Sequence, residues 1–209
     1  MNLENKLAKS QTAFENWKTV PFTEKQKLLQ KLASLLEKDA EKFGKIITQE
    51  MNKPITQSIS EVQKCALMTR YYAEAENILK PEKIKTEFRV SEIHSVPKGV
   101  ILGVMPWNFP FWQALRFAVP AILAGNTVVL KHASICFGSG NMIEKLFLKA
   151  GFPKGVFQNL EIGHEDVKKV LENPIIKGVS LTGSEKAGAE VASIAGKNIK
   201  KSLLELGGS

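Results

Sequence analysis

Asn108 lies between two prolines in the segment 106–110, which reads PWNFP. Two prolines four residues apart restrict the backbone and favour an extended loop, and this loop presents Trp107 and Asn108. The side-chain amide of Asn108 is a neutral N–H donor, suited to an oxygen that gains negative charge during a reaction. A turn in which the asparagine bonds only to the backbone explains the same pattern. The segment therefore predicts either an oxyanion-binding amide or a structural turn.

Three other segments offer groups that bind anions or accept protons. Lys131, the first residue of the sequence KHAS, can reach ribose hydroxyl groups or a phosphate. Gly183 and Ser184 precede a predicted helix, whose first N–H groups and dipole favour an anion such as a pyrophosphate. This short motif is not a G-x-G-x-x-G fingerprint, and the sequence contains none. Glu205 precedes two glycines and is either a general base or an exposed acid at the end of the chain.

Each of these segments follows a short apolar run, and helical patterns separate the runs. Continuous apolar runs of this length are typical of strands that are buried on both faces. Their alternation with helices predicts an α/β fold with a Rossmann-like parallel sheet of five strands and right-handed crossovers. Ligands bind to such sheets at the carboxyl ends of the strands, where the polar segments lie. The predicted strands are residues 100–104, 127–130, 155–160, 178–182 and 202–206, and helices are expected at about 141–150, 164–172 and 185–195.

The first eighty residues are predicted to be helical. Apolar residues recur at helical spacing between positions 28 and 47, which predicts one buried face, and residues 52–54 interrupt this pattern. Thr23 and Gln26 match a capping box at the start of this region. A further helix is expected at about 58–79.

Residues 85–97 alternate between apolar and polar types, which predicts one or two extended strands. We therefore divide the chain into N-terminal helices (1–84), a strand segment (85–98) and a Rossmann-like core of alternating strands and helices (99–209).

The two cysteines and His132 are expected to be chemically inert. Cys65 lies in a helical pattern among apolar neighbours, and Cys136 follows the lysine segment; thiols in such settings are usually unreactive. His132 has no partner acid nearby and is expected to be a surface or packing residue. Because two cysteines cannot build a disulfide framework, we expect a reducing, cytoplasmic setting.

The composition is that of an ordinary globular protein, with 44% apolar and 24% charged residues. Apolar stretches such as 117–123 are too short to span a bilayer, and the N-terminus has no signal-peptide pattern, so we expect no membrane partner. The net charge of +8 is spread along amphipathic helices, and aromatic residues do not alternate with the lysines. We therefore expect no nucleic-acid partner, and we assign no metal site.

Taken together and in this order, four of these segments resemble the aldehyde dehydrogenase superfamily. The sequence EMNKP at 50–54 is similar to a further landmark of the family, and the resemblance covers essentially the whole chain. The sequences KHAS at 131–134 and GGS at 207–209 are most similar to the bacterial succinate-semialdehyde dehydrogenase branch. The four segments are PWNFP at 106–110, AGNTVVLK at 124–131, LTGS at 181–184 and LELGG at 204–208.

The resemblance implies a role for each matching residue. The asparagine that matches Asn108 helps to hold an oxyanion in the family, and the glutamate that matches Glu205 is the general base. Lys131 matches a lysine that binds the adenosine ribose. Ser134 matches the residue that helps to choose between NAD and NADP, because a glutamate there repels a 2′-phosphate. The implied cofactor is thus NAD or NADP, bound by Met105, Pro106, Trp107, Lys131, Ser134, Gly183, Ser184, Leu206 and Gly207.

The resemblance also implies a substrate, a small-molecule aldehyde. In the family the helix after the asparagine loop lines the aldehyde tunnel. Arg116 on this helix is similar in position to an arginine that binds the substrate carboxylate in succinate-semialdehyde dehydrogenases. A surface arginine or a structural salt bridge is the alternative role of Arg116.

Members of this family are more than twice as long as this chain, and their nucleophilic cysteine lies well beyond the glutamate motif. We therefore expect a fragment: the amino-terminal part of an NAD(P)-dependent aldehyde dehydrogenase, inactive alone, with succinate semialdehyde as the expected substrate. The alternative is a non-catalytic truncated remnant that at most binds NAD(P) or a partner chain. The family forms homo-oligomers through its bridging strands, and a separate C-terminal half is the other expected partner.

Overall fold

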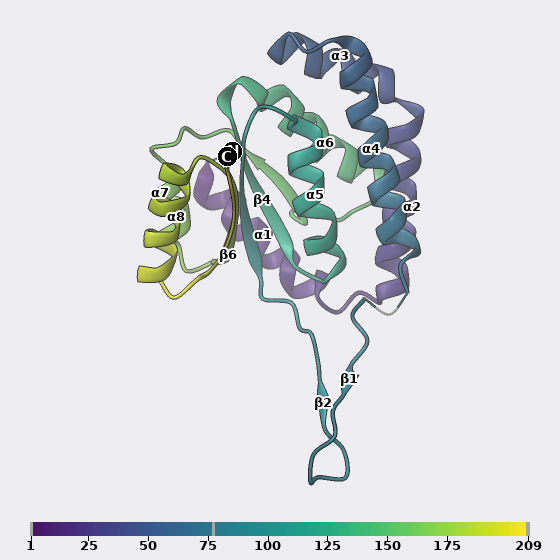
Figure 1. The fold of residues 1–209 in the computed structure, drawn as a ribbon, viewed down its shortest axis with the longest axis vertical. Helices are drawn as coiled ribbons and strands as arrows, with labels where there is room; N and C mark the ends of the chain where they lie inside the picture. The colour runs from purple at the N-terminus through teal and green to yellow at the C-terminus, as the bar shows by residue number, and fades with distance from the viewer. Residues whose placement is uncertain (1, 77, 208–209) are drawn as a thin grey trace.

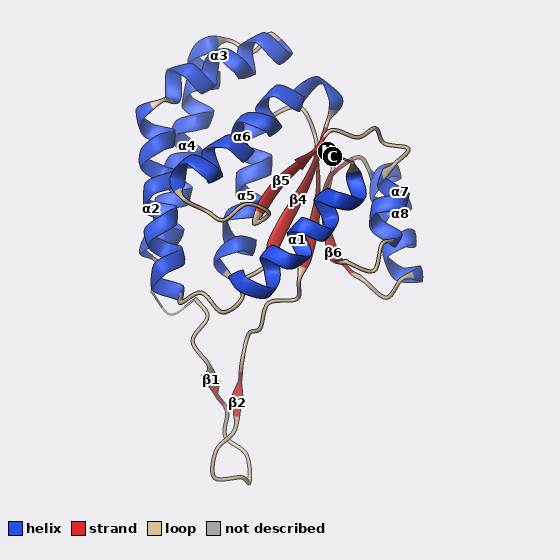
Figure 2. Cartoon of the chain, turned by 180° about the vertical axis from the view of Figure 1, so that it is seen from behind, coloured by secondary structure: helices blue, strands red, loops and turns tan. Residues whose placement is uncertain are grey.

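A five-stranded sheet forms the centre of the molecule (Figures 1 and 2). The computed structural model describes residues 2–76 and 78–207, so Gly208 and Ser209 of the predicted glycine segment lie outside the described residues. All pairings in this sheet are parallel, which confirms the predicted α/β fold. Each strand lies within two residues of its predicted position. The strands are β3 (Val100–Met105), β4 (Thr127–His132), β5 (Phe157–Leu160), β6 (Ile176–Gly183) and β7 (Lys201–Leu206).

The strand order β5-β4-β3-β6-β7 places the first strand of the sheet in its middle. The chain runs outward from β3 to β5 and then returns to β6, on the other side of β3. The connections after β3 and β6 therefore diverge, which leaves a crevice at the carboxyl ends of these two strands, the usual ligand site of such sheets. Residues 106–110 follow β3 and Ser184 follows β6, so the topology brings these predicted segments to the crevice.

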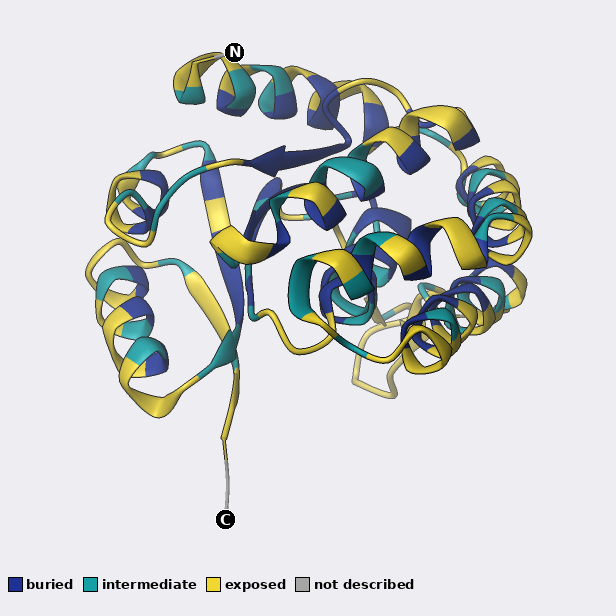
Figure 3. Ribbon diagram, turned by 90° about the horizontal axis from the view of Figure 1, so that it is seen from above, coloured by how far each residue is buried: buried dark blue, intermediate teal, exposed yellow. Residues whose placement is uncertain are grey.

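Helices cover both faces of the sheet because side chains alternate along each strand. Val128 and Leu130 belong to a core that extends through the larger helical layer, whereas Val129 belongs to a second core with residues such as Leu7 and Val191 (Figure 3). The helices of the larger layer are α2 (Phe22–Lys38), α3 (Ala40–Met51), α4 (Ile55–Glu74), α5 (Pro110–Leu123) and α6 (Phe137–Ala150), and those on the other face are α1 (Leu3–Trp17), α7 (Val167–Glu172) and α8 (Glu185–Lys197).

The predicted capping box at the start of α2 is wrong. This helix begins at Phe22 after Pro21, and no side chain caps its N-terminus. The fixed φ of a proline prepares a helix start without a cap, so Thr23 lies inside the first turn. Gln26 instead donates from Nε2 to the backbone oxygen of Ala75, 3.0 Å away, and so joins α2 to the end of α4.

Two helix boundaries also differ from the sequence pattern. The apolar face predicted between positions 28 and 47 is divided between α2 and α3 at Asp39. Helix α4 ends at Glu74, earlier than the predicted end near residue 79. The predicted interruption at 52–54 is confirmed, because Asn52 adopts the left-handed conformation with a φ of 54° and ends α3.

An extended arm projects from the body of the molecule (Figure 1). It contains two strands of two residues each, β1 (Glu82–Lys83) and β2 (Glu92–Ile93), which pair antiparallel. The first of these strands precedes the predicted start of the strand segment at residue 85. Apolar side chains on the arm, including Phe88, Val90 and Val96, are exposed to solvent.

The last strand of the sheet is the most exposed one. Every residue of β7 is exposed except Leu204, which is partly buried. The strand lies at an edge of the sheet, and Figure 3 displays it as a largely exposed ribbon. Within residues 2–76 and 78–207, no helix combines the length and the apolar character that crossing a membrane requires.

Gly155 joins α1 to the sheet at a position that has no space for a side chain. Its φ is +97°, and an added Cβ atom would lie 2.7 Å from the backbone oxygen of Lys9 and 2.9 Å from the Cβ atom of Ala13. Ser10 donates its hydroxyl hydrogen to the backbone oxygen of Gly155, 3.0 Å away. Backbone atoms of α1 cannot move aside without disturbing this contact.

We predict that Gly155→Ala lowers the free energy of unfolding by about 2 kcal/mol, because it combines a strained φ with overpacking. The matched control is Gly196→Ala in α8, where an added Cβ atom meets nothing within 4 Å. That substitution should raise the free energy of unfolding by about 0.5–1 kcal/mol, the ordinary helix preference for alanine. Urea unfolding followed by circular dichroism measures both, and equal effects would contradict the packing described for Gly155.

Candidate functional site

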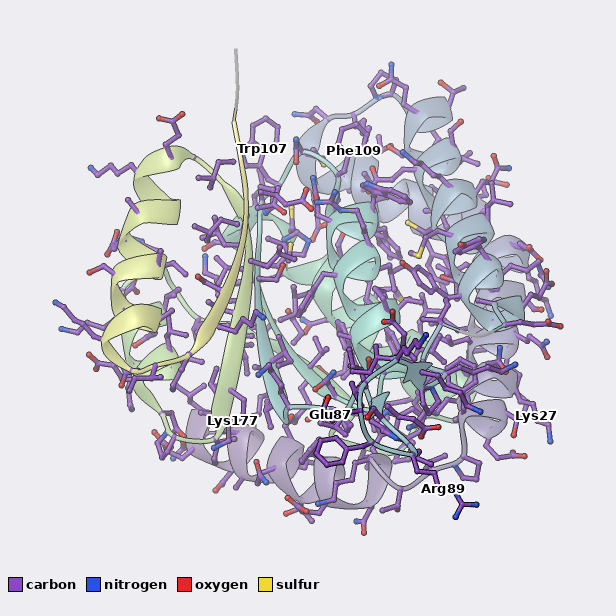
Figure 4. The ribbon with its side chains drawn as sticks, turned by 60° about the horizontal axis from the view of Figure 1, so that its bottom comes forward. Lys27, Glu87, Arg89, Trp107, Phe109 and Lys177 are labelled. Carbon is purple, nitrogen blue, oxygen red and sulfur yellow. The ribbon has the colours of Figure 1, made fainter. Side chains whose placement is uncertain are left out.

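The loop after β3 carries the first group of predicted site residues. Met105 ends the strand and is buried, whereas Trp107 and Asn108 are exposed. Figure 4 shows Trp107 and Phe109 at the opposite end of the sheet from Lys177. The side chain of Asn108 makes no hydrogen bond with another described residue, so its amide does not serve the structural turn that the sequence left as an alternative. The amide is available to a ligand.

A buried carboxylate fixes this loop from outside. Glu61 on α4 is 4% exposed, and its Oε1 accepts the backbone N–H groups of Phe111 (2.9 Å) and Trp112 (3.1 Å). These two N–H groups belong to the first turn of α5, where a helix leaves donors without an internal partner. The negative charge also complements the helix dipole. Glu61 therefore anchors the start of α5 and, with it, the end of the asparagine loop.

Lys53 completes this anchor. Its Nζ lies 2.6 Å from Oε2 of Glu61 and 3.5 Å from the backbone oxygen of Asn108. The same ammonium lies 3.7 Å from the centroid of the Phe109 ring, which is a cation–π distance. Lys53 thus contacts the acid and the loop at once, and it follows the left-handed Asn52 that ends α3.

His132, at the end of β4, holds the loop from the sheet side. Its Nδ1 accepts the backbone N–H of Ala133 (2.9 Å), so its Nε2 carries the hydrogen that it donates to the backbone oxygen of Pro110 (2.9 Å). Burial lowers the pKa of His132 below the usual value, which keeps the ring neutral. The packing role predicted for His132 is therefore correct, and its surface alternative is not.

A second carboxylate closes the N-terminus of α6. Both oxygens of Glu50, the first residue of the EMNKP landmark, accept the backbone N–H of Ser139, and Oε2 also accepts its hydroxyl. Gly138 provides the space, since an added Cβ atom there would lie 2.6 Å from Oε1 of Glu50. Helix α6 consequently begins at Phe137, before its predicted start near residue 141. The glycine-serine-glycine segment 138–140 holds a protein carboxylate at its first turn.

The N-terminus of α8 differs from those of α5 and α6. Ser184 caps it by accepting the backbone N–H of Ala187 (3.3 Å), and the N–H groups of Glu185 and Lys186 bond to no described residue. Gly188 lets the first turn approach β7 closely, because an added Cβ atom would lie 2.5 Å from Cδ2 of Leu206. Of the predicted pyrophosphate residues, Gly183 is partly buried and Ser184 is exposed at this free helix end.

Lys131 lies within β4, near its carboxyl end, and Ser134 lies just beyond that end; both are on the opposite side of β3 from Glu205. Lys131 is 9% exposed and forms no ion pair or hydrogen bond with the described residues. Burial lowers its pKa from the usual value, although Glu165 acts in the opposite direction. Ser134 begins the short 3-10 helix η1 (Ser134–Cys136) and is exposed. Lys131 is therefore a cation without a partner among the described residues, and Ser134 carries an exposed, uncharged hydroxyl.

Arg116 and Glu205 form an ion pair that joins helix α5 to the edge strand β7. Nη2 of Arg116, on α5, lies 2.6 Å from Oε2 of Glu205, on β7. The same nitrogen lies 3.2 Å from Oε1 of Gln113 and 3.4 Å from the hydroxyl oxygen of Thr182. The pair is partly open to solvent, with side-chain exposures of 35% for Arg116 and 47% for Glu205. A salt bridge is one of the two roles that the sequence allowed for Arg116.

Two cavities adjoin these residues. One of about 330 Å³ lies between α5 and the strands β6 and β7, and its lining includes Arg116, Thr182 and Glu205. The other, of about 610 Å³, lies between α4 and α5, and its lining includes Asn108 and Gln113. Gln113 also accepts from Arg116, so it touches both the asparagine cavity and the ion pair.

Neither cysteine has the surroundings of a nucleophile. Cys65, in α4, is fully buried, and burial raises its pKa well above the usual value. Burial raises the pKa of Cys136 to about 12, and Glu50 and Glu61 act in the same direction. Thiols with such pKa values hold almost no thiolate at neutral pH. Across the described ranges, no three histidine, cysteine, aspartate or glutamate side chains meet in a group that could hold a metal ion.

Sequence reasoning missed Glu50, Lys53 and Glu61. The landmark 50–54 contains the first two, but its resemblance to the family does not say what these side chains contact. Glu61 stands among polar residues of an amphipathic helix, where an acid is normally solvated. A buried acid on such a helix becomes recognisable only once α5 is placed beside it.

Comparisons with known proteins identify the family of this chain. The sequence profile described as the aldehyde dehydrogenase family matches residues 1–209. A probable succinate-semialdehyde dehydrogenase [NADP(+)] from Synechocystis is 46% identical over 205 residues, which are 98% of this chain and 45% of that protein. The succinate semialdehyde dehydrogenase [NAD(P)+] Sad of Escherichia coli is 39% identical over 209 residues, again 45% of that protein. The chain thus spans about 45% of the length of these curated relatives.

Solved structures match over the same extent. The succinic semialdehyde dehydrogenase of Streptococcus pyogenes, crystallised with NADP+, superposes with a TM-score of 0.95 at 38% identity. The match covers 99% of this chain and 46% of the other. An NAD-dependent aldehyde dehydrogenase from Sinorhizobium meliloti superposes with a TM-score of 0.93 at 31% identity, over 98% of this chain and 42% of the other.

We predict that Glu61→Ala lowers the free energy of unfolding by about 3 kcal/mol, because it leaves Lys53 without its counter-ion and two backbone donors without an acceptor. Urea unfolding measures this loss. The control is Glu41→Gln, which removes an exposed i,i+4 pair with Lys45 and should leave the free energy of unfolding essentially unchanged. A loss at Glu61 no larger than that at Glu41 would show that the buried anchor is not formed in solution.

Proposed function

The chain belongs to the aldehyde dehydrogenase family, and we propose that it forms the cofactor-binding portion of an NAD(P)-dependent enzyme that oxidises succinate semialdehyde to the carboxylic acid. Three features at one edge of the sheet carry this proposal. Asn108 presents a free amide, α8 presents a free helix N-terminus, and Glu205 lies beside Arg116. The relatives at 46% and 39% identity are named as succinate-semialdehyde dehydrogenases.

The residues present fit a dinucleotide. Glu50 and Glu61 occupy the first turns of α6 and α5. At α8 no carboxylate does so, and its first N–H groups are free to bind the pyrophosphate. Lys131, which has no partner among the described residues, would hold the adenosine ribose, beside Ser134. Met105, Pro106, Trp107, Leu206 and Gly207 would line its path between the ends of β3 and β7. The bound cofactor supplies the hydride acceptor of the oxidation.

Two residues act on the aldehyde. Asn108 donates a side-chain N–H to the substrate oxygen as negative charge develops there, and the anchor of Glu61 and Lys53 keeps this amide in place. Once a nucleophilic thiol from outside the described residues has formed a thioester with the oxidised substrate, Glu205 takes a proton from water; the water attacks the thioester carbonyl, the C–S bond breaks, the acid is released and the thiol is regenerated. Asn108 follows β3 and Glu205 lies near the end of β7, so both residues lie at the carboxyl edge of the sheet.

Arg116 gives the enzyme its preference for a substrate with a carboxylate. Its guanidinium offers several N–H donors in a plane that matches a carboxylate. The cavity of about 330 Å³ that it lines is of a size for a small semialdehyde. Gln113 and Thr182 hold the guanidinium at the rim of this cavity.

The 209 residues by themselves bind the cofactor without turning over substrate. The family reaction needs a thiolate, and the burial of Cys65 and Cys136 keeps both thiols protonated. This observation favours the alternative of a non-catalytic, cofactor-binding chain for the isolated polypeptide. Further chain, or a partner that supplies a nucleophile, would complete the site. The exposed apolar residues of the arm suit contact with another copy.

We predict that the chain binds NADP at least as tightly as NAD, because the exposed Ser134 places no negative charge near the 2′ position. Lys131→Ala should weaken the binding of both by about tenfold, the usual contribution of one charge-assisted hydrogen bond. Calorimetric titration with each dinucleotide measures the affinities. Lys25→Met, at another lysine whose pKa burial lowers, is the control and should change neither. A strong preference for NAD would contradict the role of Ser134.

We predict that the purified chain reduces NADP with succinate semialdehyde no faster than buffer does. Cys65→Ser and Cys136→Ser should leave this rate unchanged. Because thiolates are the reactive species, iodoacetamide at pH 8 should modify both thiols slowly in the native chain and rapidly in urea, where the pKa of each returns to its ordinary value. Robust turnover that Cys136→Ser abolishes would make Cys136 the nucleophile and overturn this assignment.

A further inference from the structure

The ion pair between Arg116 and Glu205 conflicts with the two roles just proposed. Arg116 must bind the carboxylate of the substrate, and Glu205 must accept a proton from water. In the structure each is the partner of the other, at 2.6 Å. While the pair is intact, Oε2 of Glu205 faces the guanidinium and not a water molecule, and Nη2 of Arg116 faces Glu205 and not a substrate carboxylate. The two groups therefore cannot perform their roles while they remain paired.

The surroundings of the pair allow an exchange of partners. Arg116 keeps contacts with Gln113 and Thr182 that do not depend on Glu205, so it stays in place when the acid leaves. Glu205 lies on the exposed edge strand β7 and is nearly half exposed, so the released carboxylate turns into water. Lys98 and Lys201 line the same cavity and favour the entry of an anion.

We propose that the substrate carboxylate displaces Glu205 from Arg116, so that an anionic aldehyde frees the general base as it binds. This inference rests on the proposed function, because it takes Arg116 as the substrate ligand and Glu205 as the base. No bond is made or broken in the exchange, and one carboxylate replaces another on the same guanidinium.

The exchange lets the site select anionic over uncharged aldehydes by more than their binding affinity. An aldehyde without a carboxylate enters the same cavity but leaves Glu205 on Arg116. Only a substrate with a negative charge at the far end from its aldehyde both docks and activates the base. Discrimination against uncharged aldehydes therefore arises at the proton transfer as well as at binding.

Succinate, a carboxylate probe with the chain length of the substrate, tests the exchange on the 209-residue chain by NMR titration. Glu205 competes with succinate in the native chain, so Glu205→Gln should tighten succinate binding by about two- to fivefold, the range for a partly exposed pair. Arg116→Leu should abolish binding. In the Arg116→Leu background, adding Glu205→Gln should have no effect, which isolates the coupling between the two residues.

Two controls separate the exchange from a general change of charge. Glu185→Gln removes a negative charge at the same edge of the sheet without touching Arg116. Glu37→Gln removes the acid from a pair with Arg70 that also measures 2.6 Å and has side-chain exposures of 35% and 48%, far from the site. Both should leave succinate affinity unchanged.

The outcomes distinguish this inference from the proposed function. If Arg116→Leu abolishes binding while Glu205→Gln changes nothing, the exchange is wrong and the substrate role of Arg116 stands. The exchange is also wrong if Glu185→Gln tightens binding as much as Glu205→Gln does. If succinate binds equally with and without Arg116, or binds to neither the native chain nor Glu205→Gln, Arg116 is not the carboxylate ligand, and both proposals fall.

Discussion

The bond between the carboxylate of Glu61 and the first turn of α5 fixes the helical layer against the carboxyl edge of the sheet. A helix start leaves N–H donors that must find a partner, and burial makes that requirement expensive to ignore. Lys53 balances the charge and touches the backbone of Asn108. The left-handed Asn52 turns the chain so that Lys53 and Glu61 meet. A turn near residue 52 thereby positions the backbone of Asn108, which lies more than fifty residues later in the chain.

The same requirement explains why one helix end remains for a ligand. Parallel strands point all the following helices the same way, so several positive helix ends gather at one edge of the sheet. Protein carboxylates close the first turns of α5 and α6, through Glu61 and Glu50. Helix α8 receives only the hydroxyl of Ser184. Internal carboxylates thus occupy the first turns of α5 and α6, whereas the first N–H groups of α8 stay open to an external anion; α7 (Val167–Glu172), which follows β5, is only six residues long.

The sequence predicted the strands and the loops that follow them, but it did not predict the carboxylates that close the helix ends. Strands such as β4, buried on both faces, have a signature in composition alone, and segments such as 106–110 mark the loops that follow them. The anchors join residues 50 and 89 positions apart, and nothing local distinguishes a buried glutamate from a solvated one. The predicted capping box failed because α2 begins after Pro21, and Gln26 instead bonds to the backbone oxygen of Ala75 just after α4, a partner that only the tertiary structure supplies. The short strands of the arm carry too few residues for a periodic signal.

The two ion pairs of the site have the same N···O distance of 2.6 Å but differ in how far they are buried. Side-chain exposures are 10% and 1% for Lys53 and Glu61, but 35% and 47% for Arg116 and Glu205. Breaking the buried pair would leave a charge without water or a partner, so that pair is permanent. Breaking the open pair costs little, because water replaces each lost contact. The central strand β3 thus leads into the loop that the buried pair holds, while the exposed edge strand β7 carries the carboxylate for which we propose a change of partner.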